Sequence, residues 1–190
     1  MSAAPKVVII GDSHVEALGP QLKRRLGLLG VNVIGFTYRR GWSTGRYNRA
    51  RDVARLVLKH GRPDVVVLSL GGNGRPRSRS GYEKILIRMV RAVRSTGVEH
   101  IVWNGPPTSL AAVSKRSADA ARRHEQNAEW QRELLPAMGV CWVDSRPMTK
   151  TGHARDGVHF TLRTGYPAWA DQLAHELSHA VRKCMGLPLA

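Results

Sequence analysis

Short runs of apolar, mostly β-branched residues recur along this chain, and each is followed by a segment with helical spacing. The clearest run spans residues 64–70 and contains Val65-Val66-Val67-Leu68. An unbroken apolar run is typical of a strand that is covered on both faces, as in a parallel sheet. Similar runs predict four more strands at residues 7–10, 31–36, 100–103 and 140–143.

The segments between these runs show the spacing of amphipathic helices. After the first run, one helical face would carry Val15, Leu18, Leu22, Leu26 and Leu29. Further helices are predicted over residues 51–60, 82–94, 114–135 and 164–182, with polar loops over 37–46 and 144–158. The alternation predicts a single α/β domain over residues 1–190: a three-layer α/β/α sandwich with a five-stranded parallel sheet, of the flavodoxin-like kind.

The composition is strongly basic, with 30 Lys and Arg against 14 Asp and Glu, a formal net charge of +16. This charge could attract a polyanionic partner such as an anionic glycan, nucleic acid or an acidic protein, or it could be an ordinary solvated surface. Cys141 and Cys184 form no disulfide framework and no metal-finger spacing, which predicts reduced thiols. No signal peptide and no transmembrane stretch is recognised, so we expect a cytoplasmic or non-classically delivered protein.

Polar residues follow several of the predicted strands, at the edge of the sheet where ligands bind in such folds. Gly11-Asp12-Ser13-His14 stands where the first strand ends and a helix begins. Free N–H groups at the start of that helix would stabilise an oxyanion next to Ser13. The alternative is that Asp12 or Ser13 only caps the helix. Gly41, Asn73 and Pro106 are expected at the same edge.

Asp156 and His159 lie three residues apart in the loop before the last predicted helix. On a turn, this spacing lets the carboxylate of Asp156 hold the imidazole of His159 so that its other nitrogen faces Ser13. The alternative is a surface turn that carries two unrelated polar residues.

Together these pieces resemble the SGNH (GDSL-like) hydrolase superfamily. Its successive blocks contain Gly-Asp-Ser, a glycine often in Gly-x-Ser, Gly-x-Asn and Asp-x-x-His. They match residues 11–13, 41–43, 71–73 and 156–159 in the same order, and the Pro106-Pro107 pair is similar to many members. One departure is Gly74, where the family commonly has Asp, which leaves open what supports Asn73.

The resemblance implies a serine esterase that hydrolyses acyl esters. Ser13 would be the nucleophile, His159 the base and Asp156 the residue that orients His159. The backbone N–H groups of Ser13 and Gly41 and the side-chain amide of Asn73 would form the oxyanion hole, and no metal or other cofactor is required. Since no long apolar lid segment is present, we expect short acyl groups, acetyl among them, on a small-molecule or glycan ester; a carbohydrate acetyl esterase is one such enzyme.

Basic and aromatic residues stand beside the predicted oxyanion donors. Their guanidinium groups could hold an acidic substrate or be solvated loop charge, and an indole could stack on a sugar ring or cover its loop. Trp103 and Trp142 lie in predicted strands and are expected in the core. The arginines concerned are Arg39, Arg40, Arg75, Arg77 and Arg79. The substrate-contact candidates are Asp12, Arg40, Trp42 and Arg75.

Two other functions compete with the esterase. Residues 175–179 fit the His-Glu-x-x-His motif of zinc peptidases. The stripe of Leu173, Leu177 and Val181 would, however, turn both histidines to solvent, and no third metal ligand follows. The other candidate is a non-catalytic basic binding module on an SGNH scaffold, associated with nucleic acid or a larger assembly. The presence of all four proposed reaction residues favours the enzyme.

Overall fold

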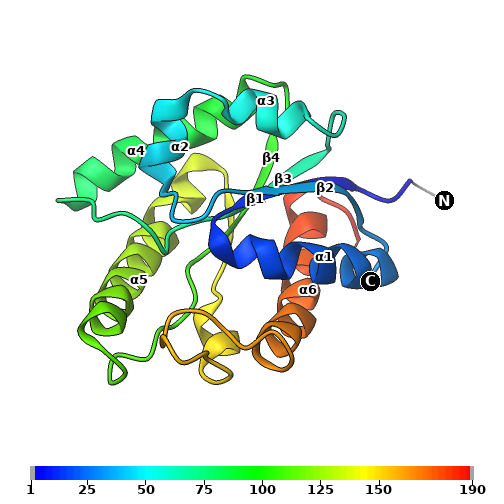
Figure 1. Cartoon of the computed structure of the whole chain (residues 1–190). Coiled ribbons are helices and arrows are strands. Elements are labelled where there is room, and N and C mark those ends of the chain that lie inside the picture. The colour runs from blue at the N-terminus through cyan, green and yellow to red at the C-terminus, as the bar shows by residue number, and fades with distance from the viewer. Residues whose placement is uncertain (1–2, 189–190) are drawn as a thin grey trace.

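The computed structural model describes residues 3–188 and has a parallel β-sheet at its centre. The five strands run in the order β2-β1-β3-β4-β5, and every neighbouring pair is parallel (Figure 1). This is the strand order of flavodoxin-like folds. The predicted α/β class with five parallel strands is confirmed. The strands are β1 (Lys6–Gly11), β2 (Asn32–Tyr38), β3 (Val65–Ser69), β4 (His100–Asn104) and β5 (Cys141–Val143).

Helices cover both faces of the sheet, which confirms the three-layer arrangement (Figure 1). One face carries α1 (Ser13–Leu28) and α6 (Gly165–Cys184). The other carries α2 (Thr44–Ala50), α3 (Val53–Leu58) and α4 (Arg79–Arg94). The remaining elements are α5 (Lys115–Leu134) and the short 3₁₀ helices η1 (Pro136–Met138) and η2 (Arg146–Thr149). Within residues 3–188, no helix has the length and apolarity needed to cross a membrane.

The packing of strand β1 on both faces explains why Val7 to Ile10 are all apolar. Val7 and Ile9 belong to the hydrophobic core beneath α1 and α6, whereas Val8 and Ile10 belong to the core beneath α2, α3 and α4. All four side chains are fully buried. Because successive side chains of a strand point to opposite faces, a strand in the middle of this sandwich needs apolar residues at every position.

The region after β2 differs from the sequence-based prediction of a loop over residues 37–46 and one helix over 51–60. Two short helices form there, because Ser43 caps α2 through a hydrogen bond from the Arg46 N–H (3.2 Å). Arg51 then adopts a left-handed conformation with φ 53°, which ends α2 before α3 begins. The predicted buried face of Val53, Leu56 and Val57 is confirmed in α3.

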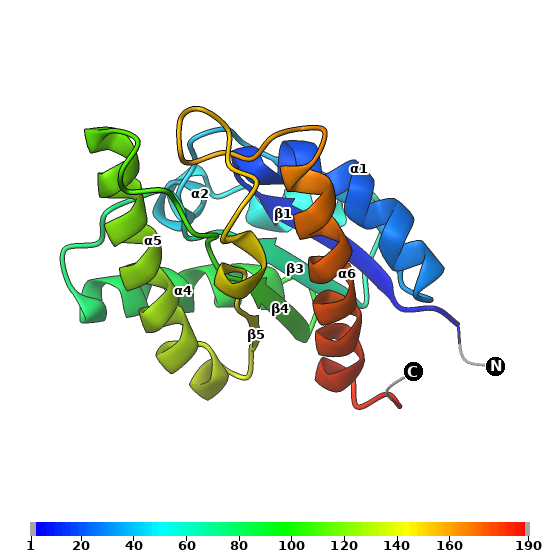
Figure 2. The ribbon, with the colours of Figure 1, turned by 90° about the horizontal axis from the view of Figure 1, so that it is seen from below.

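Helix α5 stands apart from α1 and α6 (Figures 1 and 2) and holds the segment that leaves β3. Three consecutive carbonyl oxygens of that segment accept hydrogen bonds from α5 side chains spaced four residues apart. Gln131 Nε2 donates to Leu70 (2.9 Å), Asn127 Nδ2 to Gly71 (2.8 Å) and Arg123 Nε to Gly72 (2.8 Å). We call these three side chains the α5 ladder. It supplies one donor per helical turn to a backbone that has left the sheet.

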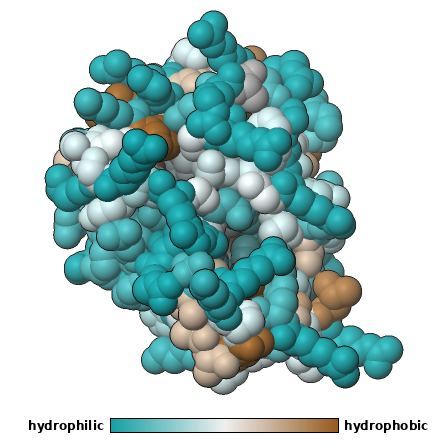
Figure 3. Space-filling model, turned by 60° about the vertical axis from the view of Figure 1, so that its left-hand side comes forward, coloured by the Kyte–Doolittle hydropathy of each residue, from teal (hydrophilic) through white to brown (hydrophobic). Residues whose placement is uncertain are grey.

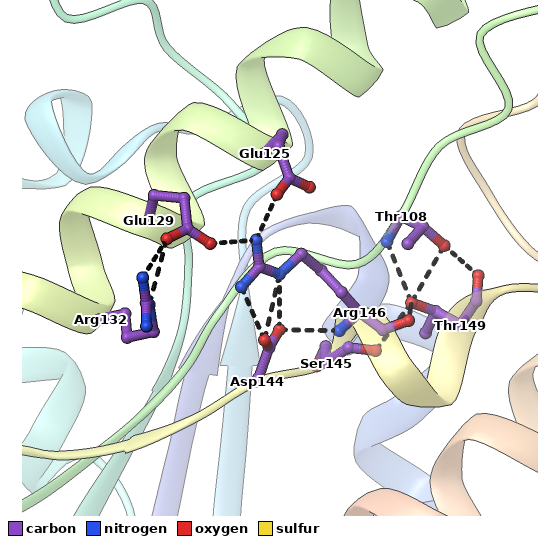
Figure 4. Close-up of polar contacts among 8 residues, drawn as sticks. All are labelled: Thr108, Glu125, Glu129, Arg132, Asp144, Ser145, Arg146 and Thr149. Atoms are coloured by element: carbon purple, nitrogen blue, oxygen red, sulfur yellow. Dashed lines mark hydrogen bonds and ion pairs between the residues drawn. The ribbon is translucent and has the colours of Figure 1, made fainter.

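The position of α5 is fixed from another side by Arg146 (Figure 4). Its Nη1 atom contacts Glu125 (2.6 Å) and Glu129 (2.7 Å) on α5, and Nη2 contacts Asp144 (2.7 Å) after β5. The side chain is 15% exposed, and the hydrogen bonds that it donates to Asp144 and Glu129 raise its pKa despite the opposing effect of burial. Arg146 therefore links α5 to the loop after β5 as a permanent cation.

The Asn127→Ala variant tests the ladder. It removes the Asn127 donor to the buried Gly71 carbonyl, so we expect a loss of about 1–3 kcal/mol in the free energy of unfolding, measured in urea. Gln126→Ala is the matched control, because Gln126 is the exposed neighbour on the same helix and should change stability by less than about 0.5 kcal/mol. Equal losses in the two variants would contradict this account of the ladder.

Candidate active site

Ser13, His159 and Asp156 form a continuous hydrogen-bonded line, although Ser13 and His159 are 146 residues apart in sequence. Ser13 Oγ lies 3.1 Å from His159 Nε2, and His159 Nδ1 lies 2.6 Å from Asp156 Oδ2. When Nδ1 donates its proton to the carboxylate, Nε2 is left as an acceptor for the Ser13 hydroxyl. The hydroxyl therefore has a base within reach, which is what a serine nucleophile requires.

Asp156 is held by its own turn. Its Oδ1 atom accepts from the backbone N–H groups of Val158 (3.0 Å) and His159 (2.9 Å), while Oδ2 faces the imidazole. Burial would raise the pKa of Asp156, but these hydrogen bonds outweigh it and lower the pKa to about 2. The carboxylate is therefore ionised at neutral pH.

The loop that carries His159 is fastened to the loop after β4. The Leu110 N–H donates to the carbonyl of Gly157 (2.7 Å), and His153 Nε2 is hydrogen-bonded to the carbonyl of Thr108 (3.1 Å). Thr108 is in turn bonded through its N–H to Thr149 Oγ1 in η2 (3.0 Å), as Figure 4 shows. On its other side, the buried ring of Phe160 packs against Trp169 of α6. These contacts hold the loop, and with it the imidazole of His159, in position above the sheet.

Asp12 joins Ser13 to Asn73. Its Oδ1 atom accepts from the His14 N–H (3.1 Å) and so caps α1, as one of the sequence-based alternatives predicts. Its Oδ2 atom accepts from Asn73 Nδ2 (3.0 Å). Asn73 thus has a partner although Gly74 occupies the position where the family commonly has Asp. The carboxylate is buried, which raises its pKa against the lowering effect of these hydrogen bonds.

A cavity of about 680 Å³ lies above Ser13 and His159. Its lining also includes four other sequence-predicted site residues, namely Asp12, Arg40, Gly41 and Asn73. Ser13 is the first residue of α1, so its N–H has no acceptor within the helix. An amide nitrogen has two hydrogens, and only one of those on Asn73 is needed by Asp12. The structure therefore brings the predicted nucleophile, base and oxyanion donors to one cavity, with Asp156 behind His159.

Most of the basic and aromatic candidates lie outside the cavity lining. Only Arg40 of the five loop arginines lines the cavity, and it forms an ion pair with Glu16. Trp42 packs on the edge of Tyr47 at a centroid distance of 5.1 Å, with the guanidinium group of Arg39 4.3 Å from its ring centre. The indole thus covers its own loop. Two other guanidinium groups face carboxylates, in the pairs Arg75–Asp119 (3.0 Å) and Arg79–Glu133 (3.0 Å).

Several residues at the cavity have a role that the sequence does not reveal, although His14 stands directly after Ser13. The buried His14 is hydrogen-bonded through Nδ1 to the hydroxyl of Tyr166 (3.1 Å), and the buried His124 donates from Nδ1 to the carbonyl of Pro107 (2.8 Å). Arg116 and Arg123 of α5 also line the cavity. The sequence of α5 does contain one signal for such contacts. Polar residues recur at helical spacing on the face of the helix that would be apolar if it packed on a hydrophobic core.

The His-Glu-x-x-His motif lies on α6, away from this cavity. His175, Glu176 and His179 are exposed, while the stripe of Leu173, Leu177 and Val181 is buried as predicted. Across residues 3–188, no group of three or more His, Cys, Asp and Glu side chains is placed to hold a metal ion.

The two buried histidines predict a pH-dependent stability. Burial lowers the pKa of His14 to about 3 and that of His124 to about 4, with a further contribution from neighbouring histidines. In the unfolded chain both would bind protons near the ordinary pKa of about 6.5. The unfolded state thus binds more protons below this pH, and the free energy of unfolding should fall as the pH drops towards 4. Each of the two histidines should contribute up to about 1.4 kcal/mol per pH unit to this fall.

Urea unfolding at several pH values between 7.5 and 4.5 measures this slope. The His124→Gln variant should show a shallower slope than the unmodified protein, and the exposed His175→Gln variant should show the same slope. Identical slopes for all three proteins would contradict the assignment to buried histidine.

Comparison with known proteins adds independent information. Residues 9–163 match the model of the GDSL-like Lipase/Acylhydrolase family. No curated protein sequence matches the chain. Solved structures resemble it at low sequence identity. A carbohydrate acetylesterase family member from Sinorhizobium meliloti is 21% identical with a TM-score of 0.71, and the match covers 96% of this chain and 100% of that one.

Two further structures have the same fold. The C-terminal catalytic domain of Streptococcus pneumoniae peptidoglycan O-acetyltransferase A is 18% identical with a TM-score of 0.65, and the match covers 98% of each chain. Est24, a carbohydrate acetylesterase from Sinorhizobium meliloti, is 14% identical with a TM-score of 0.73, over 92% of this chain and 98% of that one. The family match spans most of the sequence, including Ser13, Asn73 and His159. The chain belongs to the GDSL-like lipase/acylhydrolase family and is an ester hydrolase of the SGNH type.

Proposed function

We propose that this chain is a serine esterase that works through Ser13, His159 and Asp156. The observation that carries the proposal is the 3.1 Å distance between Ser13 Oγ and His159 Nε2, together with the 2.6 Å contact between His159 Nδ1 and Asp156. His159 takes the hydroxyl proton as Ser13 Oγ attacks the acyl carbon, and then gives the proton to the departing alcohol. A water molecule activated by His159 then cleaves the acyl-Ser13 ester and restores the free hydroxyl.

The negative charge that develops on the ester oxygen needs donors already in place. We assign this role to the N–H groups of Ser13 and Gly41 and to the side-chain amide of Asn73. All three residues line the cavity, and the bond from Asn73 to the buried Asp12 fixes the orientation of the amide before substrate arrives. These donors are neutral, so they stabilise the oxyanion without holding a charged product.

The cavity supports short acyl groups as substrates. Its apolar lining consists of a few separate side chains rather than a long apolar channel. They are Ala17, Ala120, Val158, Phe160 and Leu162. Acetyl esters of sugars are the first candidates, since the two similar Sinorhizobium meliloti structures are described as a carbohydrate acetylesterase family member and a carbohydrate acetylesterase. We assign the whole reaction to one domain that comprises residues 1–190.

A non-catalytic basic binding module is the second candidate function, and the net charge of +16 is the observation that favours it. Its partner would be a polyanion such as nucleic acid, an anionic glycan or an acidic assembly protein. Turnover of p-nitrophenyl acetate distinguishes the two functions, because a pure binding module would not hydrolyse this ester.

The Ser13→Ala variant should lose hydrolysis of p-nitrophenyl acetate by at least about a thousandfold in kcat, because the nucleophile is gone while the other groups remain. Its unfolding temperature should stay close to that of the unmodified protein. As controls, neither EDTA nor His175→Ala should change turnover. Near-normal activity of Ser13→Ala would refute the proposed nucleophile.

The Asn73→Ala variant should lower kcat by about 10²–10³-fold and leave KM nearly unchanged, because an oxyanion donor acts mainly in the transition state. Arg77→Ala is the matched control, an exposed residue of the same loop that does not line the cavity, and its kinetics should be unaltered. A change confined to KM in Asn73→Ala would instead assign Asn73 to substrate binding.

A further inference from the structure

The first turns of α5 form a cationic wall on the site cavity. Arg116 and Arg123 line the cavity that contains Ser13 and Asn73. The same two arginines line an adjoining cavity of about 470 Å³ together with Arg75, Lys115 and Asp119. This second space thus has four cationic side chains and one carboxylate on its walls. We call the five residues that line this second cavity the α5 wall.

The single carboxylate of the α5 wall is already engaged. Asp119 forms ion pairs with Arg75 (3.0 Å) and with Arg122, and these contacts lower its pKa. Among the ion pairs formed within residues 3–188, none involves Lys115, Arg116 or Arg123. The wall therefore presents positive charge that the described part of the protein leaves uncompensated.

Arg123 shows the effect of this crowding. Its Nε atom donates to the carbonyl of Gly72 (2.8 Å), and no other hydrogen bond from its guanidinium group is formed with the described residues. Burial lowers the pKa of Arg123, and the positive charges of Arg75 and Arg116 lower it further. Bringing a negative charge next to this half-buried cation would relieve both effects.

The rest of the cavity lining comes mainly from α1 and from the loops that carry Arg40 and His159. It contains the apolar side chains of Val158, Phe160 and Leu162, and its one arginine, Arg40, is neutralised by Glu16. The side of the molecule that carries α4 and α5 is mostly hydrophilic, with only separate hydrophobic spots (Figure 3). The cavity is therefore divided into an apolar side suited to a small acyl group and a cationic side suited to an anion.

We propose, building on the esterase function above, that the substrate is an ester that carries an anionic group, carboxylate or phosphate, and that Arg116 and Arg123 bind this group. A guanidinium group offers several donors in a plane that matches either anion. Because Arg123 Nε also holds the carbonyl of Gly72, next to Asn73, an anion bound on the α5 wall is positioned relative to the oxyanion donor. Arg75 also lines the adjoining cavity, but it is paired with Asp119. The loop arginines Arg39 and Arg79 line neither cavity and face carboxylates elsewhere.

Two pairs of matched esters test the proposal and locate the anion. 4-Acetoxybenzoate and 4-acetoxybenzamide differ by a charge in the alcohol part, and mono-4-nitrophenyl glutarate and its methyl ester differ by a charge in the acyl part. We expect kcat/KM for the anionic member of one pair to exceed that of its neutral partner by about tenfold. Added salt should reduce only the anionic value, since the Debye length is about 8 Å at physiological ionic strength.

Arg116→Gln should reduce the ratio of anionic to neutral kcat/KM by about five- to tenfold. Arg116 is exposed and forms no ion pair with the described residues, so the variant should fold normally, which its unfolding temperature checks. Arg132→Gln removes the same charge from the same helix away from the cavity and should leave the ratio unchanged. A ratio near one for the unmodified protein, or equal losses in the two variants, would overturn the anion subsite.

Failure of the esterase proposal is recognised separately. If neither neutral nor anionic esters are hydrolysed, the proposed function is wrong, and the subsite is then judged by binding alone. Calorimetry with Ser13→Ala should show tighter binding of 4-acetoxybenzoate than of 4-acetoxybenzamide, with the preference lost in the Ser13→Ala/Arg116→Gln double variant. Equal binding of the two compounds to Ser13→Ala would overturn the subsite independently of catalysis.

Discussion

The buried carboxylate of Asp12 is the contact on which the geometry of the site depends. One of its oxygens caps the helix that begins with Ser13, and the other accepts from the amide of Asn73. The start of α1 and the loop after β3 are thereby fixed to each other through a single side chain. Gly11 makes this close approach possible, because a Cβ atom there would lie 2.2 Å from Val15 Cγ2 and 2.7 Å from the Ser69 carbonyl oxygen. Ser13 and Asn73 are thus held in place by contacts within the protein.

Helix α5 extends this support to the rest of the loop. A backbone that leaves a sheet loses its hydrogen-bond partners, and a buried carbonyl without a donor is costly. The ladder of Arg123, Asn127 and Gln131 supplies donors one turn apart, and Arg146 fixes the helix from the side of β5. The helix can therefore be polar on its buried face, because it packs against the backbone of a loop instead of an apolar sheet.

The sequence predicts the strands and the layers well, since both depend on local pattern. Nearly all buried positions of β1 and β3 are apolar because both faces of the sheet are covered. The division of residues 44–58 into α2 and α3 depends on the left-handed conformation of Arg51, an uncommon choice for a residue with a side chain. The support of Asn73 by Asp12 joins residues 61 positions apart, and no spacing rule reveals such a contact. The contacts of His124 and Arg123 escape prediction for the same reason, since they join α5 to Pro107 and Gly72, which lie 17 and 51 positions away.

The positions of the arginines also show that contacts between distant residues cannot be predicted from the sequence. The arginines that stand next to the motifs in sequence are the natural candidates for substrate contacts, yet Arg39, Arg40 and Arg75 each face a carboxylate in the folded chain. Arg116 and Arg123, far from any motif, line the cavity and form no ion pair with the described residues. An ion pair in water contributes little to stability, but it cancels the field that would attract a substrate. What matters for recognition is therefore the charge that remains uncompensated at the cavity, and the net charge of +16 does not reveal where that is.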